Sequence, residues 1–306
     1  MRTMKTISAL LAIAASVALT GAAFAQDLGP RVKKLADGVY VHTGNGFDSN
    51  SGIILTTEGV VVIDTGQNPI EARAILETVK KLTPMPVRYV IDTEPHGDHT
   101  TGHFVFPGAT VIAAAGATES MRGADRAAPN RIATMSATSP QMKAALEGYK
   151  LITPHIEYNG KMTLNIGGKT IELTYMKGVH SESDSAVWLP NERVLFSASA
   201  FVVDQINILR PFVTIPDILA AGKTMKALNP EHVVPGHGVP GTTKIFDDGE
   251  KYYALLTQRV DALMKQGKSL DDIKKELKMP EYASFGSQDR MPTNVDAAYK
   301  ALGGRI

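Results

Sequence analysis

Cysteine is absent from this chain of 306 residues. Its absence excludes disulfide bonds, thiolate nucleophiles and cysteine ligands to a metal. Any metal ion would therefore have to be held by histidine, aspartate and glutamate side chains. The chain contains 8 histidines, so ligands of this kind are available.

An excess of charge of one sign is also absent, since 32 lysine and arginine residues stand against 31 aspartate and glutamate residues. This balance gives no electrostatic reason to expect a nucleic acid or an anionic membrane as a partner. A small-molecule substrate is the interpretation that remains, and the composition sets no oligomeric state.

Apolar runs long enough to span a membrane are absent beyond residues 1–25. Residues 1–25 have the order of a secretory signal peptide: two basic residues, a short apolar run and an Ala-Phe-Ala cleavage signal that ends at Ala25. The apolar run is too short for a comfortable membrane anchor. We expect cleavage after Ala25 and a mature chain, residues 26–306, that is periplasmic or secreted.

Predicted strands and helices alternate along the mature chain. Apolar or β-branched stretches predict strands at 39–43, 51–56, 60–64, 87–91, 109–113, 161–166, 169–175, 186–189, 194–197 and 233–234. Helical spacing and capping residues predict helices at 69–82, 215–228, 248–266, 269–278 and 294–302. Because no linker or repeat interrupts this order, one α/β domain over residues 26–306, with helices at its C-terminal end, is the simplest interpretation.

The segment after the predicted strand at 87–91 is the most informative part of the sequence. It offers four potential metal ligands within six residues, namely Glu94, His96, Asp98 and His99. In an extended stretch the first three side chains project to the same side, and the last two can straddle the start of a helix and reach one ion. A polar surface loop with chance histidines is the alternative, but three of the chain's 8 histidines lie within residues 93–103.

Two further histidines follow the ends of predicted strands. His180 comes after the strand at 169–175, and His237 comes after the short strand at 233–234. Both lie in glycine-containing loops, where a sheet delivers side chains to one edge. Each taken alone could be a hydrogen-bonded structural histidine, but both fit the same metal site as the segment after 87–91.

Five segments, in this order along the chain, resemble the metallo-β-lactamase superfamily: residues 52–66, which end in Ile63-Asp64-Thr65-Gly66; His96-Gly97-Asp98-His99; His180; residues 188–196; and Pro235-Gly236-His237-Gly238. The resemblance covers residues 36–260. It implies an α/β fold, a four-layered αβ/βα sandwich with metal at one edge of the sheets. It is poorly specific for substrate, because this fold hosts many reactions.

The resemblance also implies the ligands of one or two zinc ions. They are His96 and His180 for a first metal, and Asp98, His99 and His237 for a second metal. Asp64 is similar to a carboxylate that does not bind the metal itself but orients a metal ligand through a hydrogen bond, as metal sites generally require.

Glu94 departs from the resemblance, because the superfamily usually has histidine at this position. Glutamate can bind zinc through oxygen, so Glu94, His96 and His180 can form the first metal site. The added negative charge would weaken the metal as a Lewis acid and favour harder ions such as iron or manganese. Alternatively, Glu94 holds a water molecule and the first metal position is weakly filled.

Ser199 is a second departure, at a point where many superfamily hydrolases place a metal-bridging aspartate. Serine is a poor bridging ligand. The pattern is similar instead to one subclass of β-lactamases, in which serine occupies this position and the second metal is held by aspartate and two histidines. The similarity favours a β-lactamase-like site over a glyoxalase-like or phosphodiesterase-like one.

These features predict a hydrolase in which a metal-bound hydroxide attacks an amide or ester carbonyl, with a β-lactam-type substrate favoured. Asp98 would orient the nucleophile and carry a proton to the leaving group. Residues 204–212 could form a substrate loop with Asn207 or Arg210 as a donor, and His103 could line the pocket.

Three alternatives remain open at this point. The enzyme could hydrolyse a lactone or another ester or thioester, since export suits these substrates equally well. It could be an iron-dependent redox enzyme on the same fold, for which Glu94 is the only support. It could also be a binding module that has lost turnover, but the survival of the usual metal-ligand types argues against this.

Overall fold

The structure, a computed structural model, describes residues 27–305. The signal peptide expected at residues 1–25 lies outside this range. No helix among the described residues is long and apolar enough to cross a membrane.

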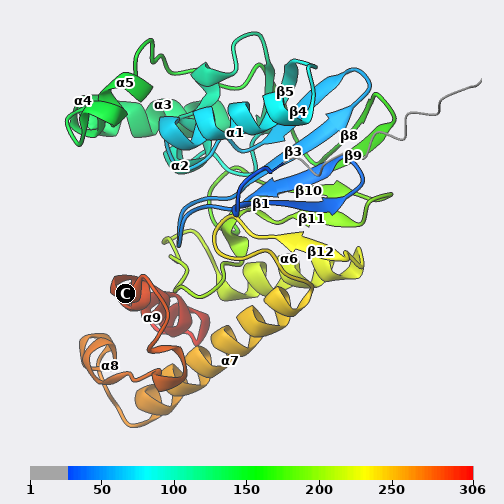
Figure 1. The fold of residues 1–306 in the computed structure, drawn as a ribbon. Coiled ribbons are helices and arrows are strands. Elements are labelled where there is room, and N and C mark those ends of the chain that lie inside the picture. Colours follow the sequence, from blue (N-terminus) through cyan, green and yellow to red (C-terminus); the bar gives the residue numbers. More distant parts are fainter. Residues whose placement is uncertain (1–26, 306) are drawn as a thin grey trace, which may run out of the picture.

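Two β-sheets form the centre of the molecule (Figure 1). The first has seven strands that lie side by side in chain order: β1 (Val32–Ala36), β2 (Val39–His42), β3 (Ser51–Thr56), β4 (Gly59–Ile63), β5 (Val87–Ile91), β6 (Thr110–Ala114) and β7 (Ile156–Tyr158). Neighbours from β1 to β4 are antiparallel, and neighbours from β4 to β7 are parallel.

The second sheet has five strands in the order β12-β11-β10-β9-β8. Their bounds are β8 (Lys161–Ile166), β9 (Lys169–Met176), β10 (Asp184–Leu189), β11 (Val194–Phe196) and β12 (His232–Val234). All neighbours are antiparallel except β11 and β12, which run parallel. Because β11 and β12 run parallel, the segments that follow them begin at the same edge of the sheet.

Helices cover the outer faces of both sheets (Figure 1). On the side of the first sheet lie α1 (Pro69–Leu82), α2 (Gly97–Thr100), α3 (Ala117–Ala127), α4 (Arg131–Ser136) and α5 (Pro140–Ala145). On the side of the second sheet lie α6 (Ile215–Ala227), α7 (Lys244–Lys265), α8 (Leu270–Glu276) and α9 (Met291–Ala301). The four-layered αβ/βα sandwich predicted from the sequence is therefore confirmed.

Strand β4 shows how the layers are held together. Val61 and Ile63 belong to the apolar cluster between the two sheets, whereas Val60 and Val62 belong to the cluster between the first sheet and α1. All four side chains are fully buried. A strand that is apolar on both faces must lie between two layers, which is what its unbroken apolar sequence predicts.

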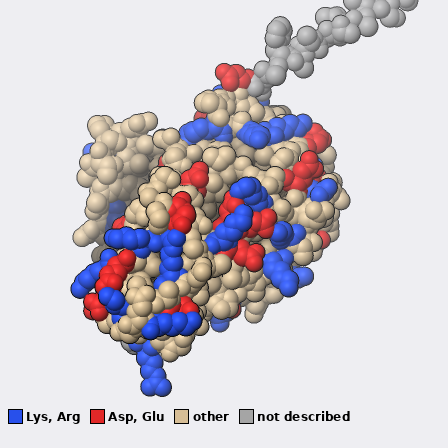
Figure 2. Space-filling view, turned by 90° about the horizontal axis from the view of Figure 1, so that it is seen from below, with Lys and Arg blue, Asp and Glu red and all other residues tan. Residues whose placement is uncertain are grey.

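The second sheet packs against the C-terminal helices through a separate apolar cluster, which includes Trp188, Leu195, Leu256 and Val295. The outer surface of these helices carries charges of both signs in alternation (Figure 2). Many of these charges are paired, as in the ion pairs Lys226–Asp247 and Arg259–Glu281.

The helix and strand boundaries differ from the predicted ones in a few places. Strands β1 and β7 were not predicted, since β1 carries two lysines and β7 has only three residues. Helix α7 begins at Lys244 instead of residue 248, and it continues through Gly249. A side chain at Gly249 would collide with the ring of Phe201, so the glycine that weakens the sequence signal permits close helix packing.

Asn50 joins the two sheets at the edge where the polar loops meet. Its Nδ2 donates to the carbonyl oxygens of Pro235 at 2.8 Å and Gly238 at 2.7 Å, and its Oδ1 accepts from the backbone N of Gly44 at 2.9 Å. The side chain is buried. The loop that contains His237 is thereby fixed to the start of β3.

We predict that Asn50→Ala lowers the free energy of unfolding by about 2–4 kcal/mol, because three buried backbone groups lose their partner. Urea unfolding in the presence of a chelator measures this without a contribution from metal binding. Asn165→Ala, at an exposed position of β8, is the control and should change the stability by less than about 0.5 kcal/mol. Equal effects of the two substitutions would contradict the role given to Asn50.

Candidate metal centre

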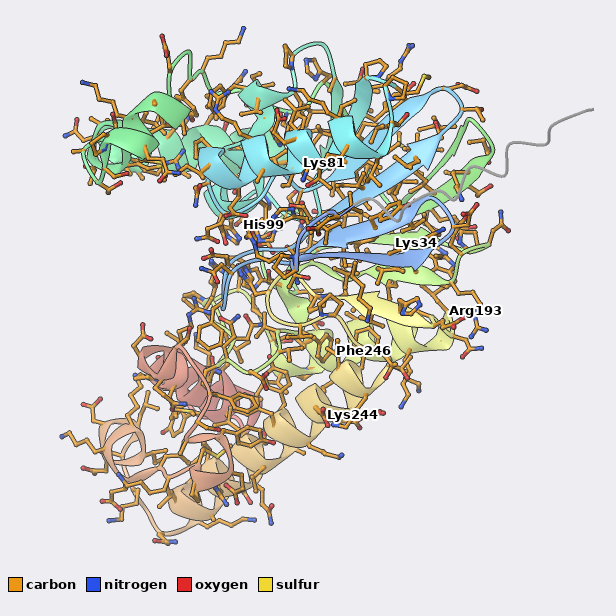
Figure 3. All side chains as sticks on the ribbon, viewed as in Figure 1. Lys34, Lys81, His99, Arg193, Lys244 and Phe246 are labelled. Atoms are coloured by element: carbon orange, nitrogen blue, oxygen red, sulfur yellow. The ribbon has the colours of Figure 1, made fainter. Side chains whose placement is uncertain are left out.

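The six predicted ligands converge at one edge of the sandwich and form two groups. Their members are Glu94, His96 and His180 in the first group, and Asp98, His99 and His237 in the second. Within each group the potential ligand atoms all lie within 4.8 Å of one another. Figure 3 labels His99, a residue of α2, at this edge. The structure thus brings together the six residues that the sequence singled out as ligands.

The local backbone explains how the segment after β5 presents four ligands. The chain is extended at His96, with φ −68° and ψ 149°, and α2 begins at the next residue. Glu94 and His96 therefore project from an extended stretch, while Asp98 and His99 lie in the first turn of the helix.

The carboxylate of Glu94 lies between the rings of the first group and contacts the second group as well. Its Oε2 contacts Nδ1 of His96 and lies 3.3 Å from Nε2 of His180. Its Oε1 lies 3.2 Å from Nε2 of His99, and it accepts hydrogen bonds from the backbone N of Ser199, at 3.1 Å, and from the Ser199 hydroxyl. Glu94 is only 1% exposed, so its charge depends on these contacts.

In the second group, three ligand atoms face one another. Oδ2 of Asp98 lies 3.3 Å from Nε2 of His237 and 3.6 Å from Nε2 of His99. The two ring nitrogens are 3.3 Å apart. The His99 ring is fully buried, whereas Asp98 is partly exposed and borders the pocket described below.

The opposite nitrogen of each ring in the second group is held by a hydrogen bond. Nδ1 of His99 donates to Oδ2 of Asp64 at 2.9 Å, and Nδ1 of His237 donates to the carbonyl oxygen of Phe47 at 2.9 Å. Asp64 is itself fixed by Thr93, whose backbone N and hydroxyl donate to it at 2.8 and 2.6 Å. With a proton on each Nδ1, the Nε2 lone pairs point to the centre, which is the form that binds a metal.

His180 is positioned by its backbone. The Asp184 carboxylate accepts from the backbone N of His180 at 2.6 Å and from that of Ser181, and Nη1 of Arg210 donates to the His180 carbonyl oxygen at 3.0 Å. Burial lowers the pKa of the His180 ring to about 3. The ring is therefore neutral and retains the lone pair that a metal ligand needs.

The electrostatics of the two groups favour a positive charge at the centre. Against the effect of burial, the carboxylates of Glu94, Asp64 and Asp98 raise the pKa of His99 well above its ordinary value. A divalent cation would supply the same positive charge while being bound by imidazole nitrogen and carboxylate oxygen. This donor set is one that zinc accepts, so the residues present fit one or two such ions.

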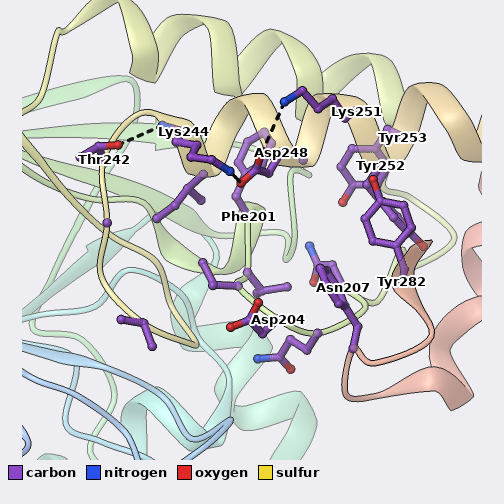
Figure 4. Close-up of a pocket in the computed structure, with 18 of the residues that line it drawn as sticks. Phe201, Asp204, Asn207, Thr242, Lys244, Asp248, Lys251, Tyr252, Tyr253 and Tyr282 are labelled. Carbon is purple, nitrogen blue, oxygen red and sulfur yellow. Dashed lines mark hydrogen bonds and ion pairs between the residues drawn. The ribbon is translucent and has the colours of Figure 1, made fainter. Parts of the chain in front are cut away.

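A cavity of about 380 Å³ opens onto both groups, and His96, Asp98, His180 and His237 form part of its wall. A larger cavity of about 470 Å³ is also lined by Asn207 (Figure 4). None of the six predicted ligands lines that larger cavity. The chemistry therefore belongs to the smaller one.

The structure corrects two of the predicted pocket residues. His103 does not reach the pocket, since it is buried with Nε2 2.8 Å from Oδ1 of Asp92 and Nδ1 2.8 Å from the carbonyl oxygen of Ile152. Asn207 borders the pocket, but its Nδ2 already donates to the carbonyl oxygens of Ser199 and Ala200. It is not a free donor for a substrate.

Arg210 does line the pocket, as the sequence suggested, and it is joined there by five residues that sequence reasoning missed. These are Phe47, Gln67, Val202, Ser287 and Arg290. The last two come from the C-terminal part of the chain, which carries no local motif. Nothing in their sequence spacing points to this site.

The fold and the cluster at its edge define a metallohydrolase. A sequence profile of the metallo-beta-lactamase superfamily matches residues 44–237. The chain belongs to this superfamily, as its five ordered segments predicted.

Two metallo-beta-lactamases illustrate the relationship. The chain is 27% identical over 120 residues to metallo-beta-lactamase type 2 of Bacteroides fragilis, a match that covers 38% of this chain and 47% of that enzyme, or about half its length. It is 25% identical over 220 residues to metallo-beta-lactamase type 2 of Bacillus cereus, covering 69% of this chain and 77% of that enzyme.

Solved structures show the same fold at low sequence identity. The sec-alkylsulfatase Pisa1 from Pseudomonas sp. has a TM-score of 0.66 at 21% identity, and the match covers 90% of this chain and 50% of that one. A metallo-beta-lactamase from Pontibacter korlensis has a TM-score of 0.55 at 21% identity, covering 71% of this chain and 94% of that one. At this level of identity the likeness concerns the fold.

We predict that Asp64→Asn lowers the zinc affinity of the second group by about 10- to 100-fold. The amide oxygen must stay on the Thr93 backbone N, so the amide NH₂ would face Nδ1 of His99 and move the ring proton to Nε2, where it blocks metal binding. Asparagine tolerates the positive φ of 52° at this position, so backbone strain does not contribute. Competition with a chromophoric chelator measures the affinity.

The control for this substitution is Asp37→Asn, since Asp37 is fully exposed and remote from the site. Zinc affinity of Asp64→Asn equal to that of the control would show that Asp64 does not orient His99.

Proposed function

We propose that the protein is an exported, zinc-dependent hydrolase that acts on an amide or ester carbonyl, with a β-lactam-type substrate favoured. The observation that carries the proposal is that both ligand groups border the same open cavity. Glu94, His96 and His180 would hold one ion, and Asp98, with two histidines, would hold the other. When bound, zinc supplies an activated water and polarises a carbonyl group.

Asp98 is placed where a residue that orients the attacking water would be needed. It borders the cavity, and its side chain is 31% exposed. Although burial opposes it, the neighbouring His99 and His237 hold the pKa of the Asp98 carboxyl well below its usual range. The group is therefore a carboxylate at neutral pH, which can orient an attacking water by accepting a hydrogen bond from it.

Ser199 supports the comparison with β-lactamases that have serine at this position. In this chain its backbone N and hydroxyl both hold Oε1 of Glu94. The serine thus orients the carboxylate that replaces the usual histidine and leaves the centre free of a bridging acid. The choice of a β-lactam as the favoured substrate rests on this pattern, on the two relatives named as metallo-beta-lactamases, and on the expected export.

Sulfate-ester hydrolysis is a second candidate function. The alkylsulfatase structure matches 90% of this chain, whereas the β-lactamase structure matches 71%. The additional coverage favours testing a sulfate ester beside the carbonyl substrates.

The test is a panel of substrates with zinc-loaded protein: a chromogenic cephalosporin, an acyl-homoserine lactone, 4-nitrophenyl butyrate and 4-nitrophenyl sulfate. We expect turnover of the cephalosporin to be the highest. His237→Ala should reduce kcat/KM by more than about 100-fold, because one ligand of the second group is lost. Absence of turnover on all four substrates would refute the proposal, and turnover of the sulfate alone would favour the second candidate.

A separate prediction concerns Glu94 as a ligand. Glu94→Ala should lower the zinc content at a fixed free zinc concentration, and Glu94→His should restore or raise it, because imidazole is a better donor for zinc. Elemental analysis after zinc titration measures both. If Glu94 instead lies outside the coordination sphere, neither substitution will change the zinc content, and predominant iron after growth in mixed metals would favour the redox alternative.

A further inference from the structure

The larger cavity is built by parts of the chain that lie far apart in the sequence. They are residues 201–207, residues 239–242, the first part of helix α7 and the turn at residues 282–285. Its volume of about 470 Å³ is that of a small-molecule site. With the cavity at the metal centre it shares only Val202, Gln205 and Asn207. A molecule bound here would therefore contact none of the six predicted ligands.

Aromatic rings form a continuous row along the inner wall of this cavity. The ring centroids of Tyr252 and Tyr282 lie 4.9 Å apart at an angle of 89°, and those of Tyr282 and Phe285 lie 5.1 Å apart at 84°. Tyr252 also meets Tyr253 edge to face, at 5.2 Å (Figure 4). Rings in such contacts are more stable than their buried area alone predicts. A further aromatic ring inside the cavity would extend the row.

The charged residues of the cavity lie at its rim and cancel one another. They are Asp204, Lys244, Asp248 and Lys251, and all four are exposed. Both lysines pair with Asp248, Lys244 in direct contact and Lys251 at 3.8 Å (Figure 4). The wall that Tyr252 forms is buried by contrast. A charged molecule would lose its hydration inside without gaining an ionic partner, which is strongly unfavourable.

Backbone hydrogen bonds hold the walls of the cavity in place. Gly286, next to the turn at residues 282–285, donates to the carbonyl oxygen of Asp204 and accepts from the backbone N of Ile206, both at 2.9 Å. On another side, Gly241 exchanges two hydrogen bonds of 2.9 Å with Val233 of β12. A cavity with fixed walls loses little free energy to ordering when a molecule binds.

We propose that the larger cavity is a binding site for an uncharged aromatic small molecule, separate from the metal centre. The row of rings selects an aromatic ligand, the cancelled charges at the rim select an uncharged one, and the volume limits its size. The inference goes beyond the proposed hydrolytic function, since binding at this site requires neither a metal ion nor turnover.

The test titrates the full chain, loaded with zinc, with 6-propionyl-2-(dimethylamino)naphthalene, an uncharged dye that emits at shorter wavelength in apolar surroundings. We expect saturable binding of a single dye molecule per chain. Tyr282→Leu removes the central ring of the row and should raise Kd by about 3- to 10-fold, whereas Tyr282→Phe keeps the ring and should bind as the unchanged chain does. Tyr299→Leu is the matched control, because Tyr299 is partly buried but lines neither cavity.

Displacement of the dye from the unchanged chain tests the class of ligand. Uncharged 2-methoxynaphthalene should displace it at a concentration about 10-fold lower than 2-naphthoate or protonated 2-(aminomethyl)naphthalene. Val239→Asp, at a wall position that is 63% exposed, should fold even where Tyr282→Leu does not, and it should also weaken dye binding. Fluorescence that does not saturate, equal affinity of these variants and Tyr299→Leu, or a preference for either ion would each overturn the proposal.

Discussion

The burial of the Glu94 carboxylate is the constraint on which the geometry of the site depends. A charged group that is 1% exposed is tolerated only when other groups compensate its charge. Here the compensation comes from His96 on the same loop, from His180 in the loop between β9 and β10, and from Ser199, which follows β11. One carboxylate therefore requires loops from both sheets to meet at the same edge. A bound cation would add to this compensation and would not disturb it.

The two departures from the superfamily pattern are best understood as one structural unit. The Ser199 hydroxyl and backbone N both donate to Oε1 of Glu94. A histidine at position 94 would offer at most one acceptor to these two donors. An aspartate at position 199 would put a second negative charge beside the buried carboxylate, which is strongly unfavourable at this distance. Glutamate at one position and serine at the other are thus mutually compatible, whereas either change alone leaves an unsatisfied or repelling group.

The sequence predicted the fold and the candidate ligands well because both are encoded locally. The unbroken apolar run at β4 indicates a strand between two layers, and the ligand segment after β5 is recognisable from its spacing. Contacts between distant parts of the chain were not predictable in the same way. His103 was misplaced because its position near the motif says nothing about its buried partner Asp92. Arg290 was missed because only the folding of the C-terminal helices brings it to the site.

The C-terminal segment, residues 284–290, also contacts a residue that supports one of the predicted ligands. The ring of Phe47 packs on Gly286, and the carbonyl oxygen of the same residue accepts the hydrogen bond that orients His237. The segment that places Arg290 at the cavity wall therefore also supports the loop behind a metal ligand. The superfamily profile ends at residue 237, before this segment begins, so the segment is a part of the chain that the profile does not describe. A change of the segment need not be neutral for the metal site, however, because Phe47 couples the two.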